Sequence, residues 1–261
     1  MNKQLLPAVK EHPYPLLFAT ISGAHLYGFP SPDSDYDLRG VHILPADEVL
    51  GLSAVRDTVE VSRKEPIDLD LVTHDIHKFF GLLLKANGYV LEQLYSPLVV
   101  HTTPEHEELK WIAKSCRHHA HHYFGFAENQ WRLFQKEKMP RVKPLLYVFR
   151  VLLSGIHLMR TGEIEANLTR LNDEYRLPYI PELIERKTQG AEHQKLDSTE
   201  TSVYASEYER LRKRLEEEAG GTSLPESPRA QAALNELLVR VRLKTLGVLK
   251  EPGAAEPYLG G

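Results

Sequence analysis

The sequence predicts an N-terminal α/β (α+β) domain with a mixed sheet, residues 1–102, and an all-α helical domain, residues 103–261. Strand-like runs alternate with helical spacing in the first hundred residues, whereas the rest of the chain has helical segments and no convincing strand. With 261 residues, the chain is long enough to bury a core in each of two domains.

The strands of the N-terminal domain are predicted from short apolar or alternating runs. Residues 16–21, LLFATI, form an apolar run bounded by a proline and a glycine, which is typical of a buried strand. Three later runs alternate well enough to form further strands, at residues 35–44, 55–63 and 67–73. Residues 74–86 then change to helical spacing, which Asn87-Gly88 is suited to end because both residues tolerate the left-handed conformation. A second short helix is expected at residues 88–96.

The segments beyond the first domain have the spacing of amphipathic helices. The run TTPE at residues 102–105 is typical of a helix start, and the helix that begins there is expected to run to Lys138. Residues 142–162 form the most apolar helix of the chain, and Gly162 ends it. Further helices are predicted near residues 163–172, 178–188, 200–219 and 228–250.

Composition and charge narrow the classes of function. The net charge of −4 and the pI of about 6.4 exclude a strongly basic protein, although a local basic groove is compatible with both values. The single cysteine, Cys116, excludes an internal disulfide and is typical of a reducing compartment. Since no run of about 20 apolar residues is present, we expect a cytoplasmic protein that does not enter a membrane.

The stretch SGAHLYGFPSPDSDYDLRGV, residues 22–41, combines glycines with several carboxylates. Asp33 belongs to the Pro- and Ser-rich turn, whereas Asp35 and Asp37 are two residues apart and share one face of the predicted strand. Two like charges on one face favour a bound cation, and oxygen ligands without cysteine favour Mg²⁺ or Mn²⁺. Two-metal sites hold their ions about 3.5–4 Å apart and need a further carboxylate from a neighbouring strand. The candidates on the next acidic strand are Asp68 and Asp70.

The glycines ahead of these carboxylates predict a phosphate-binding loop. Gly23 and Gly28 allow a tight turn between the first strand and a short helix, with backbone N–H groups available to phosphate oxygens. His25 and Tyr27 lie in this loop, where a phosphate or a base has to pass. The segment PDSD alone is compatible with an ordinary turn. The strand, the glycine loop and the two acidic strands together favour a functional site.

This arrangement resembles the signature of the nucleotidyltransferase superfamily that includes DNA polymerase β, through Gly23-Ala24, then Asp35-Tyr36-Asp37, then Asp70. The longer context is similar to the RNA-ligase-associated, polymerase-β-like branch of predicted nucleotidyltransferases. The similarity extends over roughly residues 16–172, with its specific segments at residues 23–41, 74–97, 121–131 and 142–172.

The resemblance implies a polymerase-β-type nucleotidyltransferase domain whose nucleotide cleft is closed by the helical domain. It assigns catalysis and two Mg²⁺ or Mn²⁺ ions to Asp35, Asp37 and Asp70. The family serine that contacts the phosphates is replaced by Ala24, with a serine displaced to Ser22, so we expect one phosphate hydrogen bond of about 0.5–3 kcal/mol to be lost. The residues expected at the nucleotide are Ser22, Gly23, Ala24, His25, Tyr27, Ser34, Arg39, Lys143, Tyr147 and Arg150.

A polar stripe on the most apolar helix adds some of these candidates. Its members are four, three and four residues apart: Lys143, Tyr147, Arg150 and Ser154. We expect Lys143 and Arg150 to meet phosphate charge and Tyr147 to stack on or hydrogen-bond the nucleotide, while an ordinary solvated face is the alternative. Arg39 shares a face with Asp37, which suits either orienting a carboxylate or contacting phosphate.

The run SCRHHAHHYFGF carries four histidines, of which His118 and His122 lie one helical turn apart. This spacing occurs in zinc sites. No suitable third ligand lies nearby on the same face, so we prefer a polar helix face that lines the cleft, with His122 and Tyr123 as its candidate residues.

The predicted reaction is Mg²⁺-dependent transfer of a nucleoside monophosphate from a nucleoside triphosphate (NTP) to an acceptor hydroxyl, with release of pyrophosphate. An RNA end, a protein tyrosine and a small alcohol are acceptors compatible with the sequence. Ala24 keeps open a nucleotide- or RNA-binding module without turnover. A two-metal phosphohydrolase is the other alternative.

Overall fold

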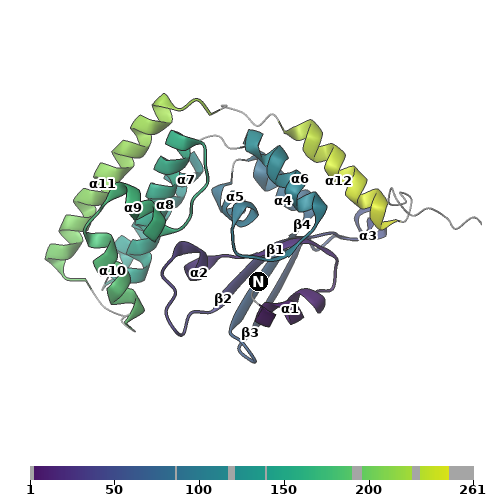
Figure 1. The fold of residues 1–261 in the computed structure, drawn as a ribbon, viewed down its shortest axis with the longest axis horizontal. Helices are drawn as coiled ribbons and strands as arrows, with labels where there is room; N and C mark the ends of the chain where they lie inside the picture. The colour runs from purple at the N-terminus through teal and green to yellow at the C-terminus, as the bar shows by residue number, and fades with distance from the viewer. Residues whose placement is uncertain are drawn as a thin grey trace, which may run out of the picture.

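The computed structural model describes residues 3–85, 87–116, 121–138, 140–189, 196–224 and 230–246. Figure 1 shows an N-terminal sheet with helices, followed by a helical region. The predicted fold class is therefore confirmed.

The sheet has five strands, β1 (Leu16–Ile21), β2 (Tyr36–His42), β3 (Thr58–Arg63), β4 (Leu69–Asp75) and β5 (Val99–Thr102). Their order is β3-β4-β2-β1-β5. The β2–β4 pair is parallel and the other neighbouring pairs are antiparallel, which makes the sheet mixed. The parallel register places Asp37 opposite Asp70, so two predicted site residues occupy neighbouring positions.

Helices pack on both faces of this sheet (Figure 1). One face is covered by α4 (Ile76–Leu84), α5 (Gly88–Tyr95), α6 (Pro104–Ala113) and α12 (Gln231–Thr245). The other face is covered by η1 (Lys3–Leu5) and α1 (Leu6–Lys10). Because side chains alternate along a strand, Val41 of β2 joins the first core and Leu38 joins the second.

The helical region is built around α8 (Val142–Thr161). The helices packed on it are α7 (His121–Lys136), α9 (Leu168–Tyr175), α10 (Tyr179–Thr188) and α11 (Ser198–Gly221). By length and composition α8 is apolar enough to cross a membrane, yet 78% of its most apolar window is buried within the protein. The short α2 (Gly23–Tyr27) contributes Ala24, Leu26 and Tyr27 to the same core, so the helical region also supports the glycine segment.

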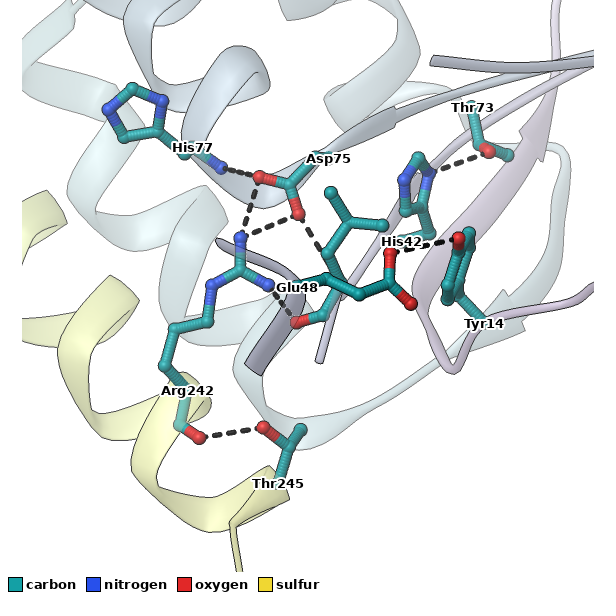
Figure 2. Close-up of polar contacts among 9 residues, drawn as sticks. Tyr14, His42, Glu48, Thr73, Asp75, His77, Arg242 and Thr245 are labelled. Atoms are coloured by element: carbon teal, nitrogen blue, oxygen red, sulfur yellow. Dashed lines mark hydrogen bonds and ion pairs between the residues drawn. The ribbon is translucent and has the colours of Figure 1, made fainter. Parts of the chain in front are cut away.

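The C-terminal helix α12 returns to the helices that cover the sheet. Its buried apolar residues are Leu234, Leu237 and Val241. Arg242 of α12 donates to both carboxylate oxygens of Asp75 at 2.7 Å, and Asp75 also accepts from the backbone N–H groups of Leu44 and His77 (Figure 2). Both α6 and α12 therefore pack with the N-terminal sheet, and the division of the chain after residue 102 stays a prediction.

The single helix expected between residues 103 and 138 is wrong. Helix α6 ends at Ala113, a 3₁₀ turn follows at Lys114–Cys116, and α7 begins at His121. The apolar side chains of α6 join the core above the sheet, whereas those of α7 join the core around α8. One straight helix cannot direct its apolar face into both cores, which accounts for the break.

One short strand and two short α-helices were not predicted from the sequence. Strand β5 has four residues, and α1 and α3 (Ala46–Leu50) have five residues each. Segments of this length show no clear periodicity, and their conformation is decided by the elements against which they pack. The short helix expected after the first strand is present as α2.

Candidate active site

The glycine segment lies directly against the second predicted carboxylate. The backbone N–H of Ser22 donates to the carbonyl oxygen of Asp37 at 2.8 Å, which joins the end of β1 to β2. Gly23 has φ of +61°, and a Cβ added there would lie 1.7 Å from Oδ2 of Asp37. Only glycine allows this approach, since a side chain would occupy the position of the carboxylate.

Asp37 and Asp70 are joined by the guanidinium of Arg39. Its Nη2 donates to Oδ1 of Asp37 at 2.6 Å and to Oδ2 of Asp70 at 2.8 Å. The predicted shared face of Asp37 and Arg39 is therefore confirmed. The side chains of Asp37 and Asp70 are 22% and 39% exposed, so this pair of carboxylates remains open to solvent at one side.

Arg39 is held by further acceptors on the protein. Its Nη1 donates to the carbonyl oxygens of Asp70, at 2.6 Å, and Leu38, at 3.2 Å, and its Nε donates to the hydroxyl of Tyr89 at 2.9 Å. Burial acts to lower the pKa of Arg39, but Tyr89 and the two carboxylates raise it overall, so this side chain is a permanent cation. Tyr89 of α5 was not predicted as a site residue, because the sequence separates it from the acidic strands.

The charges around Asp37 act on its ionisation in opposite directions. Burial raises the pKa of Asp37 above its ordinary value, and the carboxylates of Asp35 and Asp70 act in the same direction. The positive charges of Arg39 and Lys143 oppose this increase. Asp35, half-buried one residue before β2, therefore contributes to the same electrostatic site.

The oxygen donors fit a hard divalent cation in type, but they are not gathered around one position. Carboxylate oxygens are the ligands that Mg²⁺ prefers. Among the described residues, no group of three or more His, Cys, Asp or Glu side chains is arranged to hold a metal ion. Between Asp37 and Asp70 the structure has Arg39 instead. A metal ion that contacts both carboxylates at this point requires Nη2 of Arg39 to move.

Helix α8 brings two of its predicted residues toward the acidic site. The charge of Lys143 acts on Asp33 and Asp37, and Lys143 is half-buried. Burial and the nearby charge of Asp37 raise the pKa of Tyr147 to about 12. Tyr147 therefore carries a neutral hydroxyl near neutral pH, in the electrostatic field of Asp37.

The predicted phosphate contact of Arg150 is wrong, and Tyr27, which we expected at the nucleotide, is buried as well. Arg150 is fully buried, and its Nη1 donates to Oε1 of Glu92 at 2.7 Å. Its guanidinium also lies 4.0 Å from the ring centroid of Tyr27, which is 3% exposed. Ser154 is buried as well. Helical spacing places these residues on one stripe, but α8 is a central helix and half of the stripe points into protein.

The other residues of the glycine segment are buried or packed against neighbouring side chains. Ser22 and Ala24 are buried, and the Ser22 side chain makes no capping hydrogen bond to α2. His25 stacks on Tyr36 with 4.4 Å between ring centroids and 2° between ring planes. The nucleotide contacts expected of Ser22, Ala24 and His25 stay predictions.

The turn before β2 is held by a buried lysine that the sequence did not reveal. Lys187 of α10 is fully buried, and its Nζ donates to Oγ of Ser31 at 2.8 Å and to Oγ of Ser34 at 3.3 Å. Ser34 also accepts from the backbone N–H of Ser31 at 2.9 Å. The Ser34 hydroxyl, predicted to contact nucleotide, is thus engaged in the turn.

The predicted histidine cluster is described only in part. His118 and His119 lie outside the described residues. Burial lowers the pKa of His122, and Tyr123 is 2% exposed in the core around α8. The prediction that Tyr123 lies on a polar face is therefore wrong, because this side of α7 packs against α8.

Comparison with known proteins decides the family. Residues 1–240 match RlaP, described as the RNA repair pathway DNA polymerase beta family. The chain belongs to this family. The resemblance to polymerase-β-type nucleotidyltransferases, drawn from the glycine and aspartate motifs, is confirmed by this match.

Two relatives share long segments with this RlaP chain. It is 33% identical to uncharacterized protein MJ0002 of Methanocaldococcus jannaschii over 161 residues, 59% of the chain and 64% of that protein. It is 30% identical to uncharacterized protein YcgL of Bacillus subtilis over 191 residues, 68% of the chain and 71% of that protein. The chain thus matches less than two thirds of the length of the archaeal relative.

Among solved structures, the RlaP chain is similar to a nucleotidyltransferase-like protein from Exiguobacterium sibiricum. The TM-score is 0.31 at 14% identity, with 95% of this chain and 78% of the other covered. Family membership follows from the match over residues 1–240.

Proposed function

We propose that this RlaP-family protein transfers a nucleoside monophosphate from an NTP to an acceptor hydroxyl and releases pyrophosphate. The observation that carries the proposal is the pairing of Asp37 with Asp70 on parallel strands, with the glycine segment packed against Asp37. Such a pair of carboxylates beside a glycine turn is suited to an activated phosphate. Family membership supports the same class of reaction.

Asp35, Asp37 and Asp70 are the residues that would hold divalent ions. Bound Mg²⁺ would offset negative charge that develops on the transferred phosphate. Asp70 is the more exposed member of the aligned pair. It is therefore the side chain we assign to accept the proton of the acceptor hydroxyl.

Residues of α8 supply the opposite wall of the proposed site. Lys143 carries a positive charge that acts on the acidic cluster, and it is suited to a phosphate oxygen of the triphosphate. Tyr147 keeps its proton, since its pKa is raised to about 12, and so it can donate a hydrogen bond. We also propose that the helical domain that follows residue 102 closes the nucleotide cleft, with α8 as its contact to the acids.

The acceptor that we favour is the terminal hydroxyl of an RNA, because the family is described as part of an RNA repair pathway. A protein hydroxyl is the alternative. The two differ in the product that carries the label, so one reaction mixture with both acceptors distinguishes them.

The test uses ATP labelled at either the α or the γ phosphate, with Mg²⁺ and pooled RNA or protein. Transfer of the α label to an acceptor, with pyrophosphate as the second product, is the expected result. Asp37→Asn is the matched variant, and we expect it to lose transfer by about 10³-fold or more. Wild-type protein that yields no labelled acceptor with either pool would overturn the proposal.

The same experiment separates two other functions. Ala24 removes the family hydroxyl, and Arg39 already neutralises part of the acidic site, which together favour a nucleotide- or RNA-binding module as the second candidate. Tight ATP binding without transfer would support that module. Free phosphate or nucleoside monophosphate as the only labelled product would indicate a phosphohydrolase.

A further inference from the structure

We propose that Arg39 is a resident cation of the acidic site and that a divalent ion must displace its Nη2 to bridge Asp37 and Asp70. The inference rests on the proposed function, because it concerns the ion that this reaction uses. It assigns to Arg39 a positioning role, in which one side chain sets both the carboxylate spacing and the affinity for metal.

One oxygen of each aligned carboxylate already accepts a hydrogen bond from Arg39. Oδ1 of Asp37 and Oδ2 of Asp70 both accept from Nη2 of Arg39, at 2.6 and 2.8 Å. The other oxygen of Asp37, Oδ2, lies against the backbone of Gly23, where no Cβ fits. A Mg²⁺ ion binds carboxylate oxygens at about 2.0–2.1 Å, so it cannot share the bridging position with a guanidinium nitrogen.

Arg39 is held at the bridge by neutral acceptors as well as by the carboxylates. Its Nε donates to the Tyr89 hydroxyl at 2.9 Å, and its Nη1 donates to the carbonyl oxygens of Leu38 and Asp70, at 3.2 and 2.6 Å. Because the guanidinium is planar and rigid, Nη2 can leave the bridge only when these contacts loosen with it. Each neutral acceptor of this buried side chain, which is 8% accessible, therefore makes displacement by a metal ion harder.

The charges at the site make Arg39 and a divalent ion compete for the same carboxylates. The carboxylates of Asp35, Asp37 and Asp70 outnumber the cations of Arg39 and Lys143, so a negative formal charge remains at the site. The Arg39 cation stabilises the carboxylates in the absence of metal, and it opposes the approach of a second cation. Removing the charge of Arg39 should therefore strengthen metal binding while it weakens the protein that lacks metal.

The test measures Mn²⁺ affinity from the loss of the free Mn²⁺ EPR signal, on the full chain. We expect Arg39→Gln to bind Mn²⁺ about tenfold or more tightly than wild type, because a charge-assisted interaction is removed. Tyr89→Phe keeps the charge and removes one neutral anchor, and we expect a tightening of about two- to tenfold. This second variant tests the proposal even where Arg39→Gln does not fold.

Arg63→Gln is the matched control, since Arg63 on β3 pairs with Glu11 at 3.1 Å, and its register opposite Leu69 places its side chain on the other face of the sheet from Asp70. It makes the same change of net charge and should leave Mn²⁺ affinity within about twofold of wild type. The inference is overturned if neither Arg39→Gln nor Tyr89→Phe binds Mn²⁺ more tightly than Arg63→Gln does.

Failure of the inference and failure of the proposed function have different signatures. If wild type transfers label but the Arg39 and Tyr89 variants bind Mn²⁺ with unchanged affinity, the proposed competition between Arg39 and the metal ion is overturned, and the proposed reaction is not. Tighter Mn²⁺ binding in those variants without any label transfer by wild type would support the competition and overturn the reaction.

Discussion

At the scale of single residues, the site depends on the contact between the backbone of Gly23 and the carboxylate of Asp37. Gly23 adopts a positive φ, and the space where a side chain would lie contains Oδ2 of Asp37. The same glycine thus sets both the turn after β1 and the position of the carboxylate. Arg39 holds the other oxygen of Asp37, so the carboxylate is fixed from two sides.

Gly23→Ala is therefore expected both to destabilise the protein and to displace the carboxylate of Asp37. The left-handed conformation and the displaced carboxylate should lower the free energy of unfolding by about 1–2 kcal/mol or more. Gly81→Ala in α4 is the matched control, because an added Cβ there meets no atom within 4 Å, and it should stabilise by about 0.5–1 kcal/mol. Urea unfolding measures both, and a neutral Gly23→Ala would contradict this account.

At the scale of elements, α12 is a C-terminal helix that supports the N-terminal sheet. Its buried leucines pack against α4 and α6, while Arg242 reaches Asp75 at the end of β4 (Figure 2). Asp75 is 3% exposed and also caps α4. A helix far along the chain therefore completes the unit that carries Asp37 and Asp70.

Leu237→Ala is expected to lower the free energy of unfolding by about 2–5 kcal/mol, because Leu237 is 1% exposed and its loss leaves a cavity. Val239→Ala on the same helix is the control, since Val239 is 47% exposed and should change stability by less than about 0.5 kcal/mol. Equal effects of the two substitutions in urea unfolding would show that α12 does not pack as described.

The longer elements were predicted from apolar runs or from periodicity in the sequence. Strand β1, the strands that carry Asp37 and Asp70, and helix α8 all show their pattern in the sequence. The family resemblance selected Asp70, which lies opposite Asp37 in the parallel register. The break between α6 and α7, by contrast, arises because two separate cores attract adjacent helices. The burial of Arg150 has a similar origin, since spacing gives a stripe but not the neighbour that covers it.

Two residues that contact the site were missed in the sequence because they come from distant segments. Tyr89 and Lys187 reach the acidic strand from α5 and α10, and no local pattern links them to it. Only the packing of distant helices brings them to Arg39 and Ser34.

At the scale of the whole molecule, buried neutral histidines link stability to pH. His42 is fully buried, with Nδ1 2.9 Å from Oγ1 of Thr73, and burial lowers its pKa to about 4. Asp75 opposes this effect, while other nearby groups act in the same direction as burial, namely His12, His74 and Arg242. Burial likewise lowers the pKa of His106 to about 4.

Acid should therefore destabilise the fold before its carboxylates are protonated. A lowered folded-state pKa means that the unfolded chain binds the proton first, so stability is present above pH 6.5 and is lost as the pH falls toward 4. Each histidine contributes a slope of up to about 1.4 kcal/mol per pH unit. Urea unfolding between pH 7 and 5 should show a smaller slope in His42→Gln, and an unchanged slope would contradict the assignment.

The central claim is that Asp37 and Asp70 form one catalytic centre, and the rates of α-label transfer by single and double variants test it most directly. We expect Asp37→Asn and Asp70→Asn each to lower transfer by about 10³-fold or more, and the double variant to lose little beyond the worse single, because the two act as a unit. Independent losses that multiply in the double variant, or full transfer by either single variant, would contradict the claim.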